Sequence, residues 1–237
     1  MPVSEARKRM NKTFKRLIDQ GVAKCLRARN FDRKGSNFCH DLETGVVHVV
    51  DIFRPTWNQP ANGTNFHVEC GVCIRAYFEI FPDHVGLKRG RMIPREVRVR
   101  LNDLVKERML DPLFLPESIC EEDLLVFVSY LATTFENNVI PWFARFDSPL
   151  AVGDFLSSTE AAPGHHVIRY REIVQTPHDL RNAAIAYFAA GEFERARHML
   201  DLADKTIDRS GRHLTMELHE RIERLIAVSG KGPQRST

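Results

Sequence analysis

The clearest pattern of hydrophobic and polar positions runs from residue 45 to residue 78 and predicts two β-strands joined by a loop. In the second strand, residues 64–78, apolar side chains occupy every other position, which places them on one face. That face holds Phe66, Val68, Cys70, Val72, Ile74, Ala76 and Phe78, and the other holds His67, Glu69, Gly71, Cys73, Arg75 and Tyr77. A strand of this length is unusual, so we expect a bulge or bend at Gly71.

The first of these strands, residues 45–54, carries apolar side chains on both faces, which is typical of a covered or central strand. A short strand at residues 37–42 precedes it, and another alternating strand at residues 97–101 follows a basic loop. The pattern therefore predicts an antiparallel sheet of about four strands with one strongly apolar face.

Helical periodicity is clearest in residues 4–29, where apolar positions recur with the spacing of one helix face. We expect this helix to cover the apolar face of the sheet. Ser118 and Glu121 have the spacing of a capping box, which predicts the start of a second helix at Ser118. Residues 113–116 are predicted to form a loop, and residues 150–156 a brief helix.

The composition changes after residue 156, where small and polar residues with Pro and Gly predict a linker at 157–179. Within it, residues 167–174 fit a helix and a strand equally well. A helix pair follows at 180–190 and 193–205, broken at Gly191, and a final helix at 214–228. The sequence thus predicts an α+β fold: a domain at 1–156, a C-terminal helical segment at 180–228 and a disordered tail at 229–237.

The overall composition of the 237 residues says more about the cellular location of the protein than about its function. The formal net charge of +3 is mild, and no apolar run is long enough to span a bilayer. Five cysteines, an odd number, are typical of reduced thiols. We therefore expect a cytoplasmic protein without a membrane partner.

Five short segments follow one another along the chain in an order that matches a known family: 28–38 (ARNFDRKGSNF), 49–57 (VVDIFRPTW), 66–72 (FHVECGV), 97–101 (VRVRL) and 140–146 (IPWFARF). In this order and texture, roughly residues 10–156 resemble the bacterial domain of unknown function 4304 family. The resemblance implies an α+β fold and supplies neither an activity nor catalytic residues.

The C-terminal helix pair resembles a single tetratricopeptide-type hairpin. The matching positions are Ala184, Tyr187, Gly191, Phe193, Ala196, Leu200 and Ala203. Such repeats bury their faces against neighbouring repeats, so a lone hairpin fits two interpretations. It is either an ordinary helix pair packed on the first domain or on a second subunit, or an appendage that binds a peptide or protein.

Standard catalytic and cofactor motifs are absent from the sequence, including the phosphate loop, the dinucleotide fingerprint and the nucleophile elbow. Cys70 and Cys73 have the spacing of a zinc half-site, but strand alternation places them on opposite faces. We therefore expect neither a metal nor a cofactor, and the catalytic residues, if there are any, are unknown.

The polar face of the predicted sheet is the place where chemistry is best sought. It carries His67, Glu69, Arg75, Tyr77, Glu96, Arg98 and Arg100, with His40 or Asp41 and His48 or Asp51 joining from neighbouring strands. A histidine with carboxylates and arginines is suited to acid–base or phosphoester chemistry. The alternatives are non-catalytic binding and an ordinary solvated face with cross-strand ion pairs.

A basic run at residues 88–100, with Trp57 in a nearby loop, has the character of a phosphate-binding surface, although no nucleic-acid motif is present. The hypothesis that follows is a non-enzymatic, cytoplasmic protein-interaction module with a neutralising or adaptor role, whose partner is another protein. The alternative is an enzyme that acts on phosphoesters or nucleic acid through the polar face. In both interpretations the candidate binding residues are His67, Glu69, Arg75, Glu96, Arg98, Arg100 and Trp57, and the surfaces of the interaction module would be the polar sheet face and the C-terminal helix hairpin.

Overall fold

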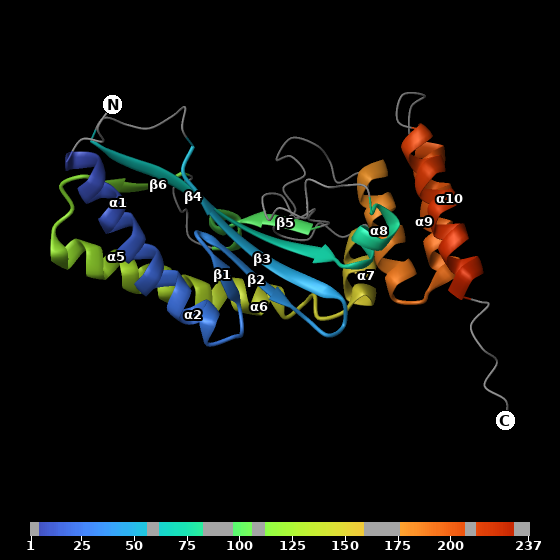
Figure 1. Ribbon diagram of the computed structural model, residues 1–237, viewed down its shortest axis with the longest axis horizontal. Helices are drawn as coiled ribbons and strands as arrows, with labels where there is room; N and C mark the ends of the chain where they lie inside the picture. Colours follow the sequence, from blue (N-terminus) through green and yellow to red (C-terminus); the bar gives the residue numbers. More distant parts are fainter. Residues whose placement is uncertain are drawn as a thin grey trace.

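The computed structural model describes residues 5–55, 62–82, 97–105, 112–158, 176–206 and 212–229, and confirms the predicted α+β fold. An antiparallel sheet runs in chain order from β1 to β5, and β6 pairs with the first residues of β4 (Figure 1). The strands are β1 (Asp32–Lys34), β2 (Asn37–Asp41), β3 (Val46–Phe53), β4 (Gly63–Ile74), β5 (Val97–Arg100) and β6 (Leu113–Pro116). The sheet thus has two strands more than the four expected, because β1 and β6 are too short to show a pattern.

Helices surround the sheet on one face and at one end (Figure 1). The N-terminal helix continues through a π-helical segment, as does the helix that follows β6. The helices are α1 (Glu5–Ile18), η1 (Asp19–Ala23), α2 (Lys24–Arg27), α3 (Ala76–Ile80), α4 (Leu101–Leu104), α5 (Glu121–Thr134), η3 (Phe135–Val139), α6 (Ile140–Phe143), α7 (Pro149–Ser157), α8 (Pro177–Ala189), α9 (Phe193–Thr206) and α10 (Arg212–Ser229).

The predicted apolar face of β4 is confirmed as the centre of the core. Its alternate residues from Phe66 to Ile74 are all buried, and Phe14 of α1 meets Phe66 edge to face with ring centroids 5.3 Å apart. Phe127 of α5 approaches Phe66 from the same side, with centroids 6.1 Å apart. The N-terminal helix therefore covers this face, as expected, together with α5.

Of the bulge or bend expected at Gly71, the bulge is absent, because β3 and β4 pair without a break from Val46 opposite Ile74 to Phe53 opposite His67. The strand is long because its first four residues pair with β6 and its later residues with β3 and β5. It also ends earlier than predicted, at Ile74. Residues 76–80 turn into α3, so Tyr77 does not belong to the polar sheet face.

Two local predictions around β6 fail for related reasons. The segment predicted as a loop at 113–116 is β6 itself, since the long β4 offers it a pairing edge that local sequence does not reveal. Helix α5 begins after Cys120 rather than at Ser118, with the Cys120 sulfur accepting a hydrogen bond from the Asp123 amide at 3.4 Å. The expected capping partner, Glu121, forms an ion pair with Arg16 of α1 instead.

The predicted C-terminal helix pair is present as α8 and α9, and Gly191 makes the turn between them with a φ of 79°. Helix α8 starts three residues earlier than expected, because Thr176 and Asp179 form a capping box. Buried residues of α7, α8 and α9 join those of the sheet in one hydrophobic cluster. Residues 167–174 and the tail from residue 230 lie outside the described residues.

Candidate functional site

The second face of the sheet is covered at one end and open at the other. Val49, Gly71 and Cys73 are buried on this face, where α8 contacts β4 and α3 contacts α8. On the same face Phe53, opposite His67 at the other end of β3, is exposed, and so is Arg98 of β5, which lies beside the packed region opposite Gly71. The face is therefore divided between a packed region and an accessible one, and only the accessible part is able to meet a ligand.

His67 and Glu69 lie two residues apart on this face of β4, as predicted, and both are half-buried. The His67 ring stacks on Phe53 of β3 with centroids 5.1 Å apart and 27° between the planes. Glu69 lies opposite Asp51 on one side and opposite Arg100 of β5 on the other. The cross-strand neighbours thus include an aromatic stack, His67 on Phe53, and oppositely charged residues facing each other, Glu69 and Arg100. Both arrangements are ordinary on a sheet face.

Arg75 follows the end of β4 and ties down the end of β2. It forms an ion pair with Asp41 and donates a hydrogen bond to the Leu42 carbonyl at 3.1 Å. Arg98 lies opposite Gly71, four residues along β4 from His67. At about 3.3 Å per residue this separates the Arg98 and His67 positions by roughly 13 Å along the strand. Trp57 and Glu96, the remaining predicted residues, lie outside the described residues.

The histidines proposed to join this face do not reach it. His48 lies on the core face, buried, with its Nε2 2.8 Å from the Phe146 carbonyl and its ring stacked on Phe143 at 4.5 Å. His40 faces His48 across β2 and β3, with ring centroids 6.2 Å apart. Burial lowers the pKa of His48, only partly offset by the hydrogen bond to Phe146. His48 is therefore a satisfied core histidine, and Asp41 and Asp51 are the residues that share the polar face.

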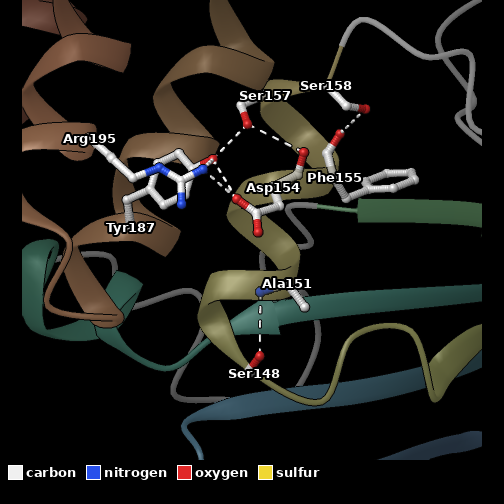
Figure 2. A network of polar contacts seen from close by, with 8 residues as sticks. All are labelled: Ser148, Ala151, Asp154, Phe155, Ser157, Ser158, Tyr187 and Arg195. Atoms are coloured by element: carbon white, nitrogen blue, oxygen red, sulfur yellow. Dashed lines mark hydrogen bonds and ion pairs between the residues drawn. The ribbon is translucent and has the colours of Figure 1, made fainter.

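A second polar group joins α7 to the helix pair, and Figure 2 shows its residues converging between these helices. The Tyr187 hydroxyl donates to the Asp154 carboxylate at 3.0 Å and lies 2.6 Å from the Ser157 hydroxyl. Arg195 of α9 lies over the Tyr187 ring, 4.0 Å from its centroid, and pairs with Asp154.

The polar group around Tyr187 is a structural junction rather than a reactive site. Burial, ahead of the hydrogen bonds, raises the pKa of Tyr187, which keeps the phenol protonated as a donor. A Cβ on Gly153 would lie 2.8 Å from the Tyr187 ring, so this position requires glycine for the close approach of α7 and α8. Sequence reasoning missed the junction because Asp154 and Tyr187 are far apart along the chain.

A third group, also missed, lies where α8 approaches the sheet. His178, Arg181 and Asn182 share one side of α8, and the positive charges of Arg181 and of Arg98 on β5 both act on His178. The i, i+3, i+4 spacing on α8 was visible in the sequence. Its closeness to Arg98 was not, because it depends on how α8 packs.

The five cysteines are free thiols, and burial raises the pKa of Cys70. Cys70 lies on the core face and Cys73 on the other, as strand alternation requires. Within the described ranges no group of three or more His, Cys, Asp or Glu side chains is placed to hold a metal ion. None of the helices in this part of the chain has both the length and the apolar composition needed to cross a bilayer.

Comparison with known proteins adds no function to this geometry. No protein family model, no curated protein and no solved structure matches the chain. The resemblance to the domain of unknown function 4304 family therefore stays an expectation, and any functional proposal rests on the surfaces themselves.

Proposed function

We propose that the protein is a non-enzymatic protein-interaction module whose docking surface is the outer side of α5. Three large apolar side chains are exposed there: Leu125 by 48%, Val126 by 69% and Tyr130 by 40%. They lie within two helix turns, with the small residues Ser129 and Thr133 between and beside them. Single exposed apolar residues are ordinary, but a group of this kind on one helix is typical of an interaction surface.

The charges around α5 define the chemistry of the partner. Residues 117–139 contain acids and no Lys or Arg. At the start of the helix Glu117, Glu122 and Asp123 are exposed, while Glu121 is already paired with Arg16. The surface therefore fits an amphipathic helix that lays apolar residues on Val126 and Tyr130 and has Lys or Arg at the end that meets the acidic turn.

The partner is thus best sought among proteins that present a basic amphipathic helix. The cytoplasm is the proposed setting, since five free thiols are typical of a reducing compartment. The function is binding alone: the residues proposed for catalysis are spread along β4, and His67 stacks on an aromatic ring rather than facing Arg98.

The test uses the full chain and a matched pair of variants. Val126→Asp places a charge in the centre of the docking surface, and Val228→Asp makes the same change at an equally exposed position on α10, 70% exposed. Proteins captured by the wild-type chain are identified, and binding is then reconstituted from purified components. The proposal predicts that Val126→Asp weakens the reconstituted complex at least tenfold and that Val228→Asp does not.

Two other outcomes would overturn this proposal. One is a complex that Val126→Asp leaves intact. The other is concentration-dependent self-association of the wild-type chain that Val126→Asp abolishes, because the occupant of α5 would then be a second copy of the protein.

The alternative, an enzyme acting on phosphoesters or nucleic acid, draws support from one observation: Arg98 and Arg100 lie on the same sheet face as His67 and Glu69. Hydrolysis of a generic phosphodiester or of single-stranded RNA by the purified chain, lost in His67→Ala, would favour it over the binding module. No turnover is expected.

A further inference from the structure

One side of α8 presents a prearranged set of hydrogen-bond donors. The buried Asn182 amide nitrogen lies 3.2 Å from the Nε2 atom of His178. An amide NH2 group only donates, so Nε2 accepts and the ring proton of neutral His178 lies on Nδ1. Asn182 thus fixes the histidine so that its Nδ1–H is left to donate elsewhere.

Arg181, one turn along the same side of α8, is half-buried, and its Nη1 atom is shielded from water without a hydrogen-bond partner among the described residues. Burial lowers the pKa of this guanidinium group. Burying part of a cation without a partner costs free energy, so the position is unfavourable in the ligand-free protein.

Arg98 approaches from the sheet. It is exposed on the second face of β5 and forms no hydrogen bond or ion pair within the described part of the chain. Part of the His178 ring is shielded by neighbouring atoms although the residue is exposed overall, and this shielding is the largest cause of its lowered pKa. Arg181 and then Arg98 lower the pKa further, in keeping with their positions: Arg181 lies about one turn from His178 on α8, and Arg98 lies opposite Gly71 of β4, the strand that α8 contacts.

The nearby carboxylate on α8, that of Asp179, already accepts hydrogen bonds from Thr176. The Asp179 carboxylate raises the pKa of His178, but its Oδ2 accepts from the Thr176 backbone amide at 3.1 Å and from the Thr176 hydroxyl at 2.6 Å. It closes the capping box of α8 and forms no ion pair with Arg181 or Arg98. Two guanidinium groups therefore share this place without a partner among the described residues.

We propose that Arg98, His178 and Arg181 form a binding site for a small phosphate-bearing anion. Guanidinium groups present paired N–H donors that match phosphate oxygens, and two of them approaching from β5 and α8 suit a dianion better than a single carboxylate. Asn182 acts as a positioning residue through His178. The site lies away from α5, so it stands or falls independently of the docking surface (Figure 1).

The experiment titrates the full chain with inorganic phosphate and, separately, with glycerol phosphate at constant ionic strength. Binding is followed by calorimetry and by the NMR titration of His178. The site predicts saturable binding of both anions and a rise in the pKa of His178 when phosphate is bound, because the ligand's negative charge favours the imidazolium. Tighter binding of glycerol phosphate would identify a phosphomonoester as the natural source of the group.

Arg181→Met keeps most of the apolar stem and removes the cation. It should weaken phosphate binding at least about tenfold, the loss expected for a charged hydrogen bond. It should leave the ligand-free melting temperature unchanged or raised, whereas a structural role for Arg181 would lower it. Arg98→Gln, at an exposed position without a hydrogen bond or ion pair to another described residue, should also weaken binding.

Arg224→Met on α10 removes an exposed arginine elsewhere and controls for the change in net charge. Absence of saturable binding to the wild-type chain would overturn the proposal. So would equal affinity in wild type, Arg181→Met and Arg98→Gln, or an equal loss of affinity in Arg224→Met.

Discussion

The division of β4 into a core face and a polar face is tested by neighbouring substitutions, Val68→Asp and His67→Ala. Val68 is 3% exposed in the hydrophobic cluster, opposite Ile52 of β3. Removing its buried side chain costs about 1.5–3 kcal/mol, and burying an unpaired carboxyl group adds about 2 kcal/mol or more. The sum, about 4 kcal/mol or more, is a large part of the 5–15 kcal/mol that typically holds a domain folded.

His67→Ala removes a side chain on the opposite face, where the ring stacks on Phe53. An aromatic pair of this kind is worth about 0.5–1.5 kcal/mol, so the variant should stay well folded. For a chain of this size each kcal/mol shifts the melting temperature by about 2–4 °C. We expect losses of about 8–16 °C for Val68→Asp, or failure to fold, against a few degrees for His67→Ala.

Differential scanning calorimetry of both variants at pH 7 measures the two shifts on the same footing. Equal losses in the two variants would refute the face assignment, and with it the placement of Glu69 and Arg98 on an accessible surface. A larger loss in His67→Ala would mean that the polar face, rather than the face toward α1, carries the core.

Three further predictions concern burial and the helix junction. Burial lowers the folded-state pKa of His48 below its unfolded value of about 6.5, so the unfolded chain binds the proton more readily as the pH falls. Chemical denaturation from pH 7.5 to pH 5 should therefore show the free energy of unfolding decreasing as the pH falls, and His48→Gln should reduce that decrease; an unchanged pH dependence in His48→Gln would contradict the buried placement of the ring. Tyr187→Phe keeps the ring beneath Arg195 but loses the hydroxyl contacts, and a loss of about 1–2 kcal/mol in urea denaturation is expected; no loss would show that the polar junction does not stabilise the fold. Gly153→Val forces a side chain against the Tyr187 ring and should lower the melting temperature by more than Tyr187→Phe does, so a neutral result would contradict the close packing of α7 on α8.

Local pattern was sufficient to predict the parts of the fold that depend on local chemistry. Alternation along β4 identified the buried residues from Phe66 to Ile74, and helical spacing identified α1 and the α8–α9 pair with its turn at Gly191. These features were predictable because the spacing of apolar residues along the chain follows the period of the strand or helix that buries them.

The failures come from contacts between distant segments. Glu121 was expected to cap its own helix, but Arg16, more than a hundred residues earlier, offers it a stronger partner. Strand β6 exists only because β4 extends far enough to pair with it. An alternating pattern also continued past Ile74 into α3, so periodicity alone did not show where the strand ends.

The candidate site was predictable only in part, for the same reason. Strand alternation placed His67, Glu69, Arg98 and Arg100 on one face, but it gave no information on what covers that face. The cluster with Arg181 depends on the packing of α8, and the many apolar residues of α5 favour a mostly buried helix, which hides its exposed apolar side. The exposure of a side chain is the property hardest to predict here, because it depends on which distant segments pack against its helix or strand.

The central claim, that the outer side of α5 binds a partner protein, is tested most directly by hydroxyl-radical footprinting of the purified complex. Leu125 and Tyr130 should lose much of their modification when the partner binds, while Leu214 and Met216 on α10, which are comparably exposed, should keep theirs. Unchanged modification of Leu125 and Tyr130, with protection at Leu214 and Met216, would contradict the account and move the docking surface to the C-terminal helices.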